Sequence, residues 1–283
     1  MKIIMLGCGW LGQQLLPLLQ QDGHQLIVTR QSAAAVQQLP GTVQGVVLSL
    51  PLSEPITAEL QALFQQAVVI CSLTPGWRKQ AGAGYVAALE SLAALMQTAG
   101  SLACIHFSST GVYQGLSGEV DESTPLQLSD AKVQLLVQGE QIVRAAVPTC
   151  TLRLGGLFGP GRHPANFLRS GVIDEPDAAV NMVHSSDVLA AVQQIVRQQA
   201  WPALFNLCCP VRASRQQFYQ QARASLALDA LQIGVAQGHN QRRVLSDQIG
   251  RQLPFQFRYA SALDALKLVD KPPLSASDTN LSE

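Results

Sequence analysis

Residues 1–12 of the chain read MKIIMLGCGWLG, and this stretch decides the fold. The apolar run 2–6 predicts a buried strand, and a helical pattern follows the last glycine. Between them, Gly7, Gly9 and Gly12 form the pattern G-x-G-x-x-G, which in this strand–helix context is typical of a dinucleotide-binding site. Gly7 permits a tight turn, Gly9 lets the backbone approach a diphosphate, and Gly12 lets the helix pack on the strand. The diphosphate would then lie against the N–H groups at the start of the helix.

Beyond this motif, predicted strands and helices alternate along the chain. Strand-like runs are 25–29, 43–48, 67–71, 102–107 and 149–154, helical stretches are 13–21, 32–39, 57–65, 83–98 and 129–146, and an edge strand is expected at 255–259. Such alternation implies right-handed crossovers and a parallel, doubly wound sheet, so the predicted fold class is α/β of the Rossmann type. Ligands bind such sheets beyond the carboxyl ends of the strands.

The predicted domain division follows this pattern. Residues 1–160 form a dinucleotide-binding domain, and 181–207 are expected to pack back on it. Residues 161–180 and 208–270 are expected to form a small C-terminal lobe on the substrate side. The polar, proline-led tail 271–283 is expected to be disordered.

Composition argues against several classes of partner. Nineteen basic residues balance nineteen acidic ones among 283, so there is no electrostatic case for nucleic acid or an anionic membrane. No apolar run is long enough to cross a bilayer, and no signal-peptide pattern is present. The six cysteines show no metal-ligand spacing and fall mostly in or beside apolar runs, as small buried hydrophobes do. We therefore expect a cytoplasmic protein with a small-molecule ligand and no metal; a homodimer stays open.

The residues after the second strand favour NADP over NAD. A carboxylate about 20 residues beyond the glycine motif usually binds the ribose 2′-hydroxyl of NAD. Here Arg30 stands at that place, between Thr29 and the Gln31-Ser32 pair, and an arginine suits a 2′-phosphate. The end of the fourth strand is expected to lie over the cofactor too. The full predicted cofactor-binding set is Gly7, Gly9, Trp10, Leu11, Gly12, Thr29, Arg30, Ser32, Ser72, Leu73 and Thr74.

Four further motifs carry a resemblance to a known family. The run 108–113, SSTGVY, follows the fifth strand and resembles the extended short-chain dehydrogenase/reductases, also called the NAD-dependent epimerase/dehydratase family. The resemblance continues through 120–125 (VDESTP), 152–162 (LRLGGLFGPGR) and 181–188 (NMVHSSDV). Within the family the chain most resembles the atypical, YeeZ-like branch. The resemblance implies a nicotinamide cofactor and oxidation, reduction or epimerisation at a carbonyl or alcohol of a small, nucleotide-sugar-like substrate.

The Tyr-x-x-x-Lys pair of that family is missing. None of the four tyrosines, at positions 85, 113, 219 and 259, is followed four residues later by lysine. Counting back from Glu140, which resembles the family's helix glutamate, puts Lys132 at the tyrosine place and Leu136 at the lysine place; taking Lys132 as the lysine instead puts Leu128 at the tyrosine place. The YeeZ-like branch is known for this loss. Two function classes stay open: an enzyme, which we favour, and a catalytically silent NAD(P)-binding sensor or regulator.

Candidate catalytic and substrate residues come from the same resemblance. Ser109 matches the family's catalytic serine, Thr110 is its neighbour, and either a water or Lys132 would complete the proton relay that hydride transfer needs. The predicted cleft lies between segments 75–85, 108–113 and 159–166. The residues expected to contact substrate are Tyr113, Arg162, His163, Asn166 and His184, although Tyr113 and His184 also fit packing roles. Arg162 indicates an anionic or phosphorylated ligand.

Overall fold

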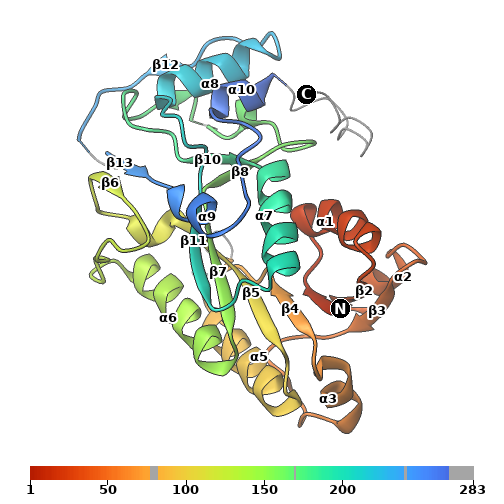
Figure 1. Ribbon diagram of the computed structural model, residues 1–283. Coiled ribbons are helices and arrows are strands. Elements are labelled where there is room, and N and C mark those ends of the chain that lie inside the picture. The colour runs from red at the N-terminus through yellow and green to blue at the C-terminus, as the bar shows by residue number, and fades with distance from the viewer. Residues whose placement is uncertain (77–81, 169, 239–240, 268–283) are drawn as a thin grey trace.

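A parallel seven-stranded sheet forms the centre of the computed structural model, which describes residues 1–76, 82–168, 170–238 and 241–267. The strand order is β11-β7-β5-β4-β1-β2-β3 (Figure 1). The bounds are β1 Lys2–Leu6, β2 Gln25–Arg30, β3 Gln44–Val47, β4 Val68–Cys71, β5 Ala103–Ser109, β7 Thr149–Leu154 and β11 Ala203–Leu207. Every neighbouring pair runs parallel, which confirms the predicted Rossmann-type α/β fold. The predicted tail 271–283 lies outside the described residues.

Helices cover both faces of this sheet, as Figure 1 shows. One face carries α1 (Trp10–Gln21) and α7 (Ser185–Gln198); the other carries α3 (Ala58–Phe64), α5 (Tyr85–Ala99) and α6 (Ala131–Ala146); the short α2 (Ala33–Gln37) lies beside β3. Strand β1 shows why both faces are apolar. Ile3 and Met5 belong to the cluster under α1 and α7, whereas Ile4 and Leu6 belong to the cluster under α3, α5 and α6. This alternation is the period of a strand that is buried on both sides.

A smaller lobe forms around a separate apolar cluster at the carboxyl ends of the strands. Phe158, Phe218 and Leu231 are buried members of that cluster. The remaining elements are β6 (Gly118–Val120), β8 (Gly156–Phe158), β9 (Val172–Ile173), β10 (Met182–His184), α8 (Arg215–Ala224), β12 (Gln232–Ile233), β13 (Arg242–Val244), α9 (Asp247–Gln252), α10 (Ala262–Leu266) and the 3-10 turns η1 (Thr110–Tyr113) and η2 (Pro164–Asn166). Within the described ranges, no helix is long and apolar enough to cross a bilayer.

The edge strand predicted at 255–259 is wrong, because this segment is irregular. Phe255 and Phe257 meet edge to face, with ring centroids 5.0 Å apart, and both pack into the sheet's core with Ile249 and Leu253. Apolar residues at i and i+2 are typical of a strand. Here both side chains pack into the same core, but the backbone does not form a strand. This part of the predicted lobe therefore packs on the sheet through α9. The domain division as a whole stays a prediction.

Candidate functional site

The three glycines of the first loop are required for three different reasons. Gly7 has a φ of +78°, a conformation that side chains disfavour, and a Cβ there would lie 3.0 Å from Ser72 Oγ. A Cβ on Gly12 would lie 3.3 Å from both Cys8 Sγ and Met5 Cε, so glycine lets α1 approach β1. Gly9 has a φ of −76°, and no described atom lies within 4 Å of its Cβ position. The room at Gly9 therefore faces outward, where a ligand's diphosphate would approach the helix.

The start of α1 is also suited to an anion. Its N-cap residue, Gly9, has no side chain to accept from the first N–H groups. The hydroxyl of Ser72 lies 2.9 Å from the carbonyl oxygens of both Leu6 and Gly7, so the end of β4 is bound to the glycine loop. Uncapped N–H groups and the helix dipole together favour a phosphate at this position. Beyond Ser72, Leu73 packs against the core and Thr74 is exposed.

Arg30 lies against the glycine loop from the end of β2. Its Nη1 donates to the carbonyl oxygen of Cys8 at 2.5 Å. Burial raises the pKa of the Cys8 thiol, although the nearby Arg30 charge opposes the shift. Ser32, two residues on, is exposed and accepts from the N–H of Ala35 as the N-cap of α2. A positive charge is thus held beside the loop, where the predicted 2′-phosphate would lie.

Two residues of the predicted cofactor set turn their side chains away from this region. Thr29 is buried in the sheet, and its hydroxyl lies 3.5 Å from the carbonyl oxygen of Met5. The side chain of Leu11 packs in the core between α1 and the sheet. The side chains of both residues therefore point into the core and not toward the predicted cofactor. Only the backbone of either residue could contact a ligand.

Ser109 and Lys132 both lie against Gly111, just beyond the end of β5. Ser109 Oγ accepts from the N–H of Gly111 at 3.0 Å and so begins η1. The Cβ position of Gly111 is 3.2 Å from Ser109 Oγ and 3.6 Å from Lys132 Cε, and both side chains are half-buried. Thr110 does not join them, because its hydroxyl is buried 3.3 Å from the carbonyl oxygen of Leu154. Thr110 is therefore structural, which corrects its predicted catalytic role.

Tyr113 belongs to a buried polar network and not to a substrate surface. It is fully buried, donates from its hydroxyl to Asn206 Oδ1 at 2.9 Å, and accepts from Arg153 Nη1 at 2.9 Å. Arg153 in turn forms a two-pronged ion pair with Glu140, with distances of 3.0 and 2.8 Å. Glu140 also accepts from Ser108 Oγ at 2.6 Å. This network joins β5, β7, β11, η1 and α6, and it corrects the predicted substrate role of Tyr113.

The loop after β8 connects the glycine loop to the small lobe. Trp10 Nε1 donates to the carbonyl oxygen of Pro160 at 2.7 Å. The guanidinium carbon of Arg162 lies 5.4 Å from the centre of the Trp10 ring and 5.8 Å from that of Phe167. His163 accepts from the N–H of Ala165 through Nδ1, and its Nε2 is 3.2 Å from Ser225 Oγ of the lobe. Asn166, at the end of η2, is exposed and lines a second pocket in the lobe.

His184 is a packed residue. It is 5% exposed, and its ring meets Phe158 and Tyr259 edge to face, with centroids 5.3 and 5.0 Å away. Its Nδ1 accepts from the N–H of Ser186 as the N-cap of α7. Burial, with a smaller contribution from the Arg258 charge, lowers the pKa of His184 to about 4. A neutral, enclosed imidazole of this kind is structural at neutral pH, which corrects the predicted substrate contact.

Comparisons with known proteins agree with this geometry. Protein YeeZ of Escherichia coli K12 is 27% identical over 274 residues, which span 93% of this chain and 97% of YeeZ. Among solved structures, UDP-glucuronic acid 4-epimerase from Bacillus cereus in complex with NAD is 15% identical, with a TM-score of 0.74 over 95% of this chain and 97% of that one. MoeE5 in complex with UDP-glucuronic acid and NAD is 18% identical, with a TM-score of 0.76 and the same coverage. No protein-family profile matches the chain.

The chain is similar to protein YeeZ over nearly its whole length, and it shares its fold with solved NAD-dependent epimerase and short-chain dehydrogenase/reductase structures. The resemblance predicted from the motifs is thereby confirmed, and it extends beyond residue 210 to nearly the whole length. In this YeeZ-like chain Lys132 lies on the first turn of α6, and Leu136 is buried one turn further along. Of the predicted cleft's three walls, segment 75–85 includes residues 77–81, which lie outside the described residues.

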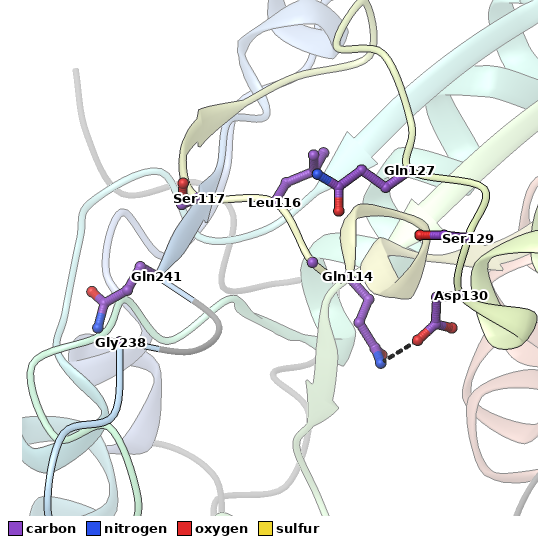
Figure 2. Close-up of a pocket in the computed structure, with 9 residues that line it drawn as sticks. Gln114, Leu116, Ser117, Gln127, Ser129, Asp130, Gly238 and Gln241 are labelled. Atoms are coloured by element: carbon purple, nitrogen blue, oxygen red, sulfur yellow. Dashed lines mark hydrogen bonds between the residues drawn. The ribbon is translucent and has the colours of Figure 1, made fainter.

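A polar pocket of about 620 Å³ opens between segments 114–117 and 127–130 and residues 238 and 241 of the YeeZ-like chain (Figure 2). We call it the amide pocket, after the polar side chains that line it: Gln114, Ser117, Gln127, Ser129, Asp130 and Gln241, with Gly115, Leu116 and Gly238 completing the wall. Gln114 Nε2 donates to Asp130 Oδ2 at 2.9 Å, and Asp130 Oδ1 accepts from the N–H groups of Lys132 and Val133 at 2.8 and 3.1 Å. The same carboxylate thus faces the pocket and caps α6.

Sequence reasoning missed the amide pocket and most of the buried network. The sequence carries one signal for this network, which is a charged residue in an element that is otherwise buried. Arg153 is the one charged residue of its strand, and Glu140 lies on the inner face of α6. Charged residues at such positions are rarely buried unless they are paired. The pocket gave no signal, because its walls come from separate parts of the chain, with residues 238 and 241 more than 100 positions after 114–117 and 127–130.

Proposed function

We propose that this chain binds a nicotinamide cofactor, with NADP preferred, and uses it in oxidation, reduction or epimerisation at a carbonyl or alcohol carbon of a small substrate. The observation that carries the proposal is the position of Ser109 and Lys132 at the end of β5. In the strand order, β5 is separated from the glycine loop of β1 only by β4. At ordinary strand spacing this separation is roughly 10 Å. The solved neighbours in complex with NAD support the choice of cofactor class.

The residues that would hold the cofactor follow the carboxyl edge of the sheet. Arg30, with Ser32 beside it, would bind the adenosine 2′-phosphate near β2. Gly7, Gly9, Gly12 and the backbone of Trp10 would receive the diphosphate at the start of α1. Ser72, Leu73 and Thr74, at the end of β4, would border the rest of the dinucleotide. When bound, a nicotinamide supplies the hydride donor or acceptor.

Ser109 and Lys132 would serve the substrate oxygen. Ser109 Oγ would donate a hydrogen bond that polarises a carbonyl. Lys132 would supply the proton as an ammonium in reduction, or receive it as a neutral amine in oxidation, directly or through a water. Arg162, His163 and Asn166 border the opposite side of the proposed cleft. Arg162, held against Trp10, would face any anionic group of the substrate.

Replacing Arg30 by alanine is expected to weaken NADP binding by roughly 10- to 100-fold, the usual value of a charged hydrogen bond to phosphate. NAD binding should change little, because NAD has no 2′-phosphate. Titration calorimetry with both cofactors measures this difference. Arg251→Ala, at an exposed arginine on α9, is the matched control and should change neither affinity. Tighter binding of NAD than of NADP by the unmodified protein would overturn the NADP assignment, and failure to bind either would overturn the proposed function.

The alternative function is a cofactor-binding sensor, which the missing Tyr-x-x-x-Lys pair favours. A panel of carbonyl substrates, followed by NADPH absorbance, separates the two. Turnover by the unmodified protein supports the enzyme. Cofactor binding without turnover across the panel, together with a protein partner that binds only when cofactor is present, supports the sensor.

A further inference from the structure

The polar side chains that line the amide pocket determine which class of ligand it can bind. Its polar side chains are three amides, two hydroxyls and one carboxylate, and none of the described residues that line it is Lys or Arg. Amides both donate and accept hydrogen bonds, and hydroxyls do the same. A hydroxyl-rich ligand can therefore satisfy such a wall, whereas a phosphate or carboxylate finds no positive charge there.

Asp130 gives the pocket its one charge. Oδ1 already accepts from two N–H groups of α6, whereas Oδ2 accepts only from Gln114 among the bonds described above. A carboxylate oxygen has two lone-pair sites, so Oδ2 has the capacity to accept from one hydroxyl of a ligand. Figure 2 shows the side chains of Gln114 and Asp130 directed toward each other, with Gln127, Ser117 and Gln241 among the other residues that line the pocket.

The pocket's position links it to the reaction centre. Gln114 directly follows η1, which Ser109 begins, and Asp130 lies two residues before Lys132. In Figure 1 the elements next to the pocket, β6 and β13, lie on the opposite side of β5 and β7 from α1 and β2. The glycine loop, the Ser109–Lys132 pair and the amide pocket thus follow one another along the carboxyl edge. A substrate that reacts at Ser109 would extend away from the cofactor into this pocket.

Contacts on two sides of the amide pocket hold its lining side chains in place. Gly115 has a φ of +87°, and a Cβ there would lie 2.6 Å from Gln127 Oε1. Glycine at this turn therefore leaves the Gln127 amide in place against the pocket. In the small lobe, the buried Glu175 accepts from the N–H of Gly238 at 3.2 Å and from Gln241 Nε2 at 3.1 Å, which fixes the facing wall.

We propose that the amide pocket binds an uncharged, hydroxyl-bearing part of the substrate, such as a polyol or sugar chain without a phosphate, and that Asp130 is its specificity determinant. This inference rests on the proposed function. The two parts of the substrate then occupy different places. The hydroxylated end lies in the amide pocket, and an anionic group, where the substrate carries one, lies at the Arg162 loop. A phosphate seated in the pocket would instead face the Asp130 carboxylate.

The test compares carbonyl compounds in matched pairs. Dihydroxyacetone, glyceraldehyde and erythrose are each compared with their monophosphates, by kcat/KM with NADPH and by saturation-transfer NMR on the cofactor-loaded protein. The unmodified protein should prefer the neutral member of each pair. Asp130→Asn, which can still cap α6, should reduce that preference by about tenfold, because one charge at contact distance is removed. Glu119→Gln, at an exposed ion pair on β6, removes the same charge outside the pocket and should leave the preference unchanged.

Three results would overturn the proposal: preference for the phosphorylated compounds, an unchanged preference in Asp130→Asn, or no binding of any neutral compound to cofactor-loaded protein. Circular dichroism and thermal melting verify that each variant is folded. The proposed function fails separately, through absence of cofactor binding in the calorimetric titration. The NMR arm still reports on the pocket if turnover is absent.

Discussion

Replacing Glu140 by glutamine is expected to lower the free energy of unfolding by about 3–5 kcal/mol, which is a large part of the stability of an ordinary domain. Glu140 and Arg153 are 3% and 5% exposed, so neither charge can be solvated by water. Burial alone would lower the pKa of Arg153, but the hydrogen bonds and charge of Glu140 outweigh burial and raise it. Without the carboxylate, the guanidinium stays charged and loses the two-pronged ion pair that compensates its burial. Denaturant titration measures the loss.

Two further variants separate this explanation from a simple packing defect. The double variant Glu140→Leu with Arg153→Met removes both charges and should lose less than Glu140→Gln alone, because no unpaired charge is buried. Glu119→Gln breaks an exposed ion pair with Arg243 and should cost less than about 1 kcal/mol. A loss that small for Glu140→Gln would contradict the role given to the network. Since Tyr113 and Ser108 belong to this network, the double variant should also loosen η1, which Ser109 caps.

Local sequence patterns predicted the sheet because parallel strands leave a strong local signal. The runs 2–6 and 149–154 are strands with the predicted bounds, since each is mostly apolar or β-branched and is followed directly by a glycine. The glycine motif predicted its own backbone geometry for a similar reason: Gly7 has a positive φ in a tight turn, Gly12 lies against Met5 and Cys8 within a few residues, and Gly9 faces open space. Helix α1 begins at Trp10, earlier than predicted, because Gly9 itself is the N-cap.

Side-chain direction was harder to predict, because it depends on partners far along the chain. Tyr113 meets Asn206, 93 residues away, and Thr110 meets Leu154, 44 residues away. A motif that resembles a family places such residues near a site but does not say which way each one faces. Within SSTGVY, only Ser109 and Gly111 face Lys132, while Ser108, Thr110 and Tyr113 face the interior. The amide pocket, formed by Gln114, Asp130 and Gln241 from separate segments, was beyond any local pattern.

Replacing Lys132 by methionine is expected to reduce turnover by about 10²–10⁴-fold, the usual contribution of a positioned proton donor or acceptor. With Leu136 at the family's lysine place and no tyrosine on the first turn of α6, Lys132 is the titratable group that the structure brings beside Ser109. Methionine keeps the length and the apolar stem of the side chain, so packing against Gly111 should survive. Cofactor affinity should stay within about twofold, since the ammonium acts on the substrate oxygen. The measurement is kcat and KM on whichever carbonyl compound the panel identifies, with calorimetry for NADP.

Comparison with Ser109→Ala then tests whether the two groups act together. If Ser109 polarises the substrate oxygen while Lys132 supplies its proton, each single variant should lose most of the activity, and the double variant should lose much less than the product of the two effects. Lys267→Met, at an exposed lysine on the lobe, is the matched control and should leave turnover unchanged. Full activity in Lys132→Met would mean that a water alone exchanges the proton. Ser109 would then be the only side chain needed at the reacting oxygen, and no other side chain would take over the role of the missing Tyr-x-x-x-Lys pair.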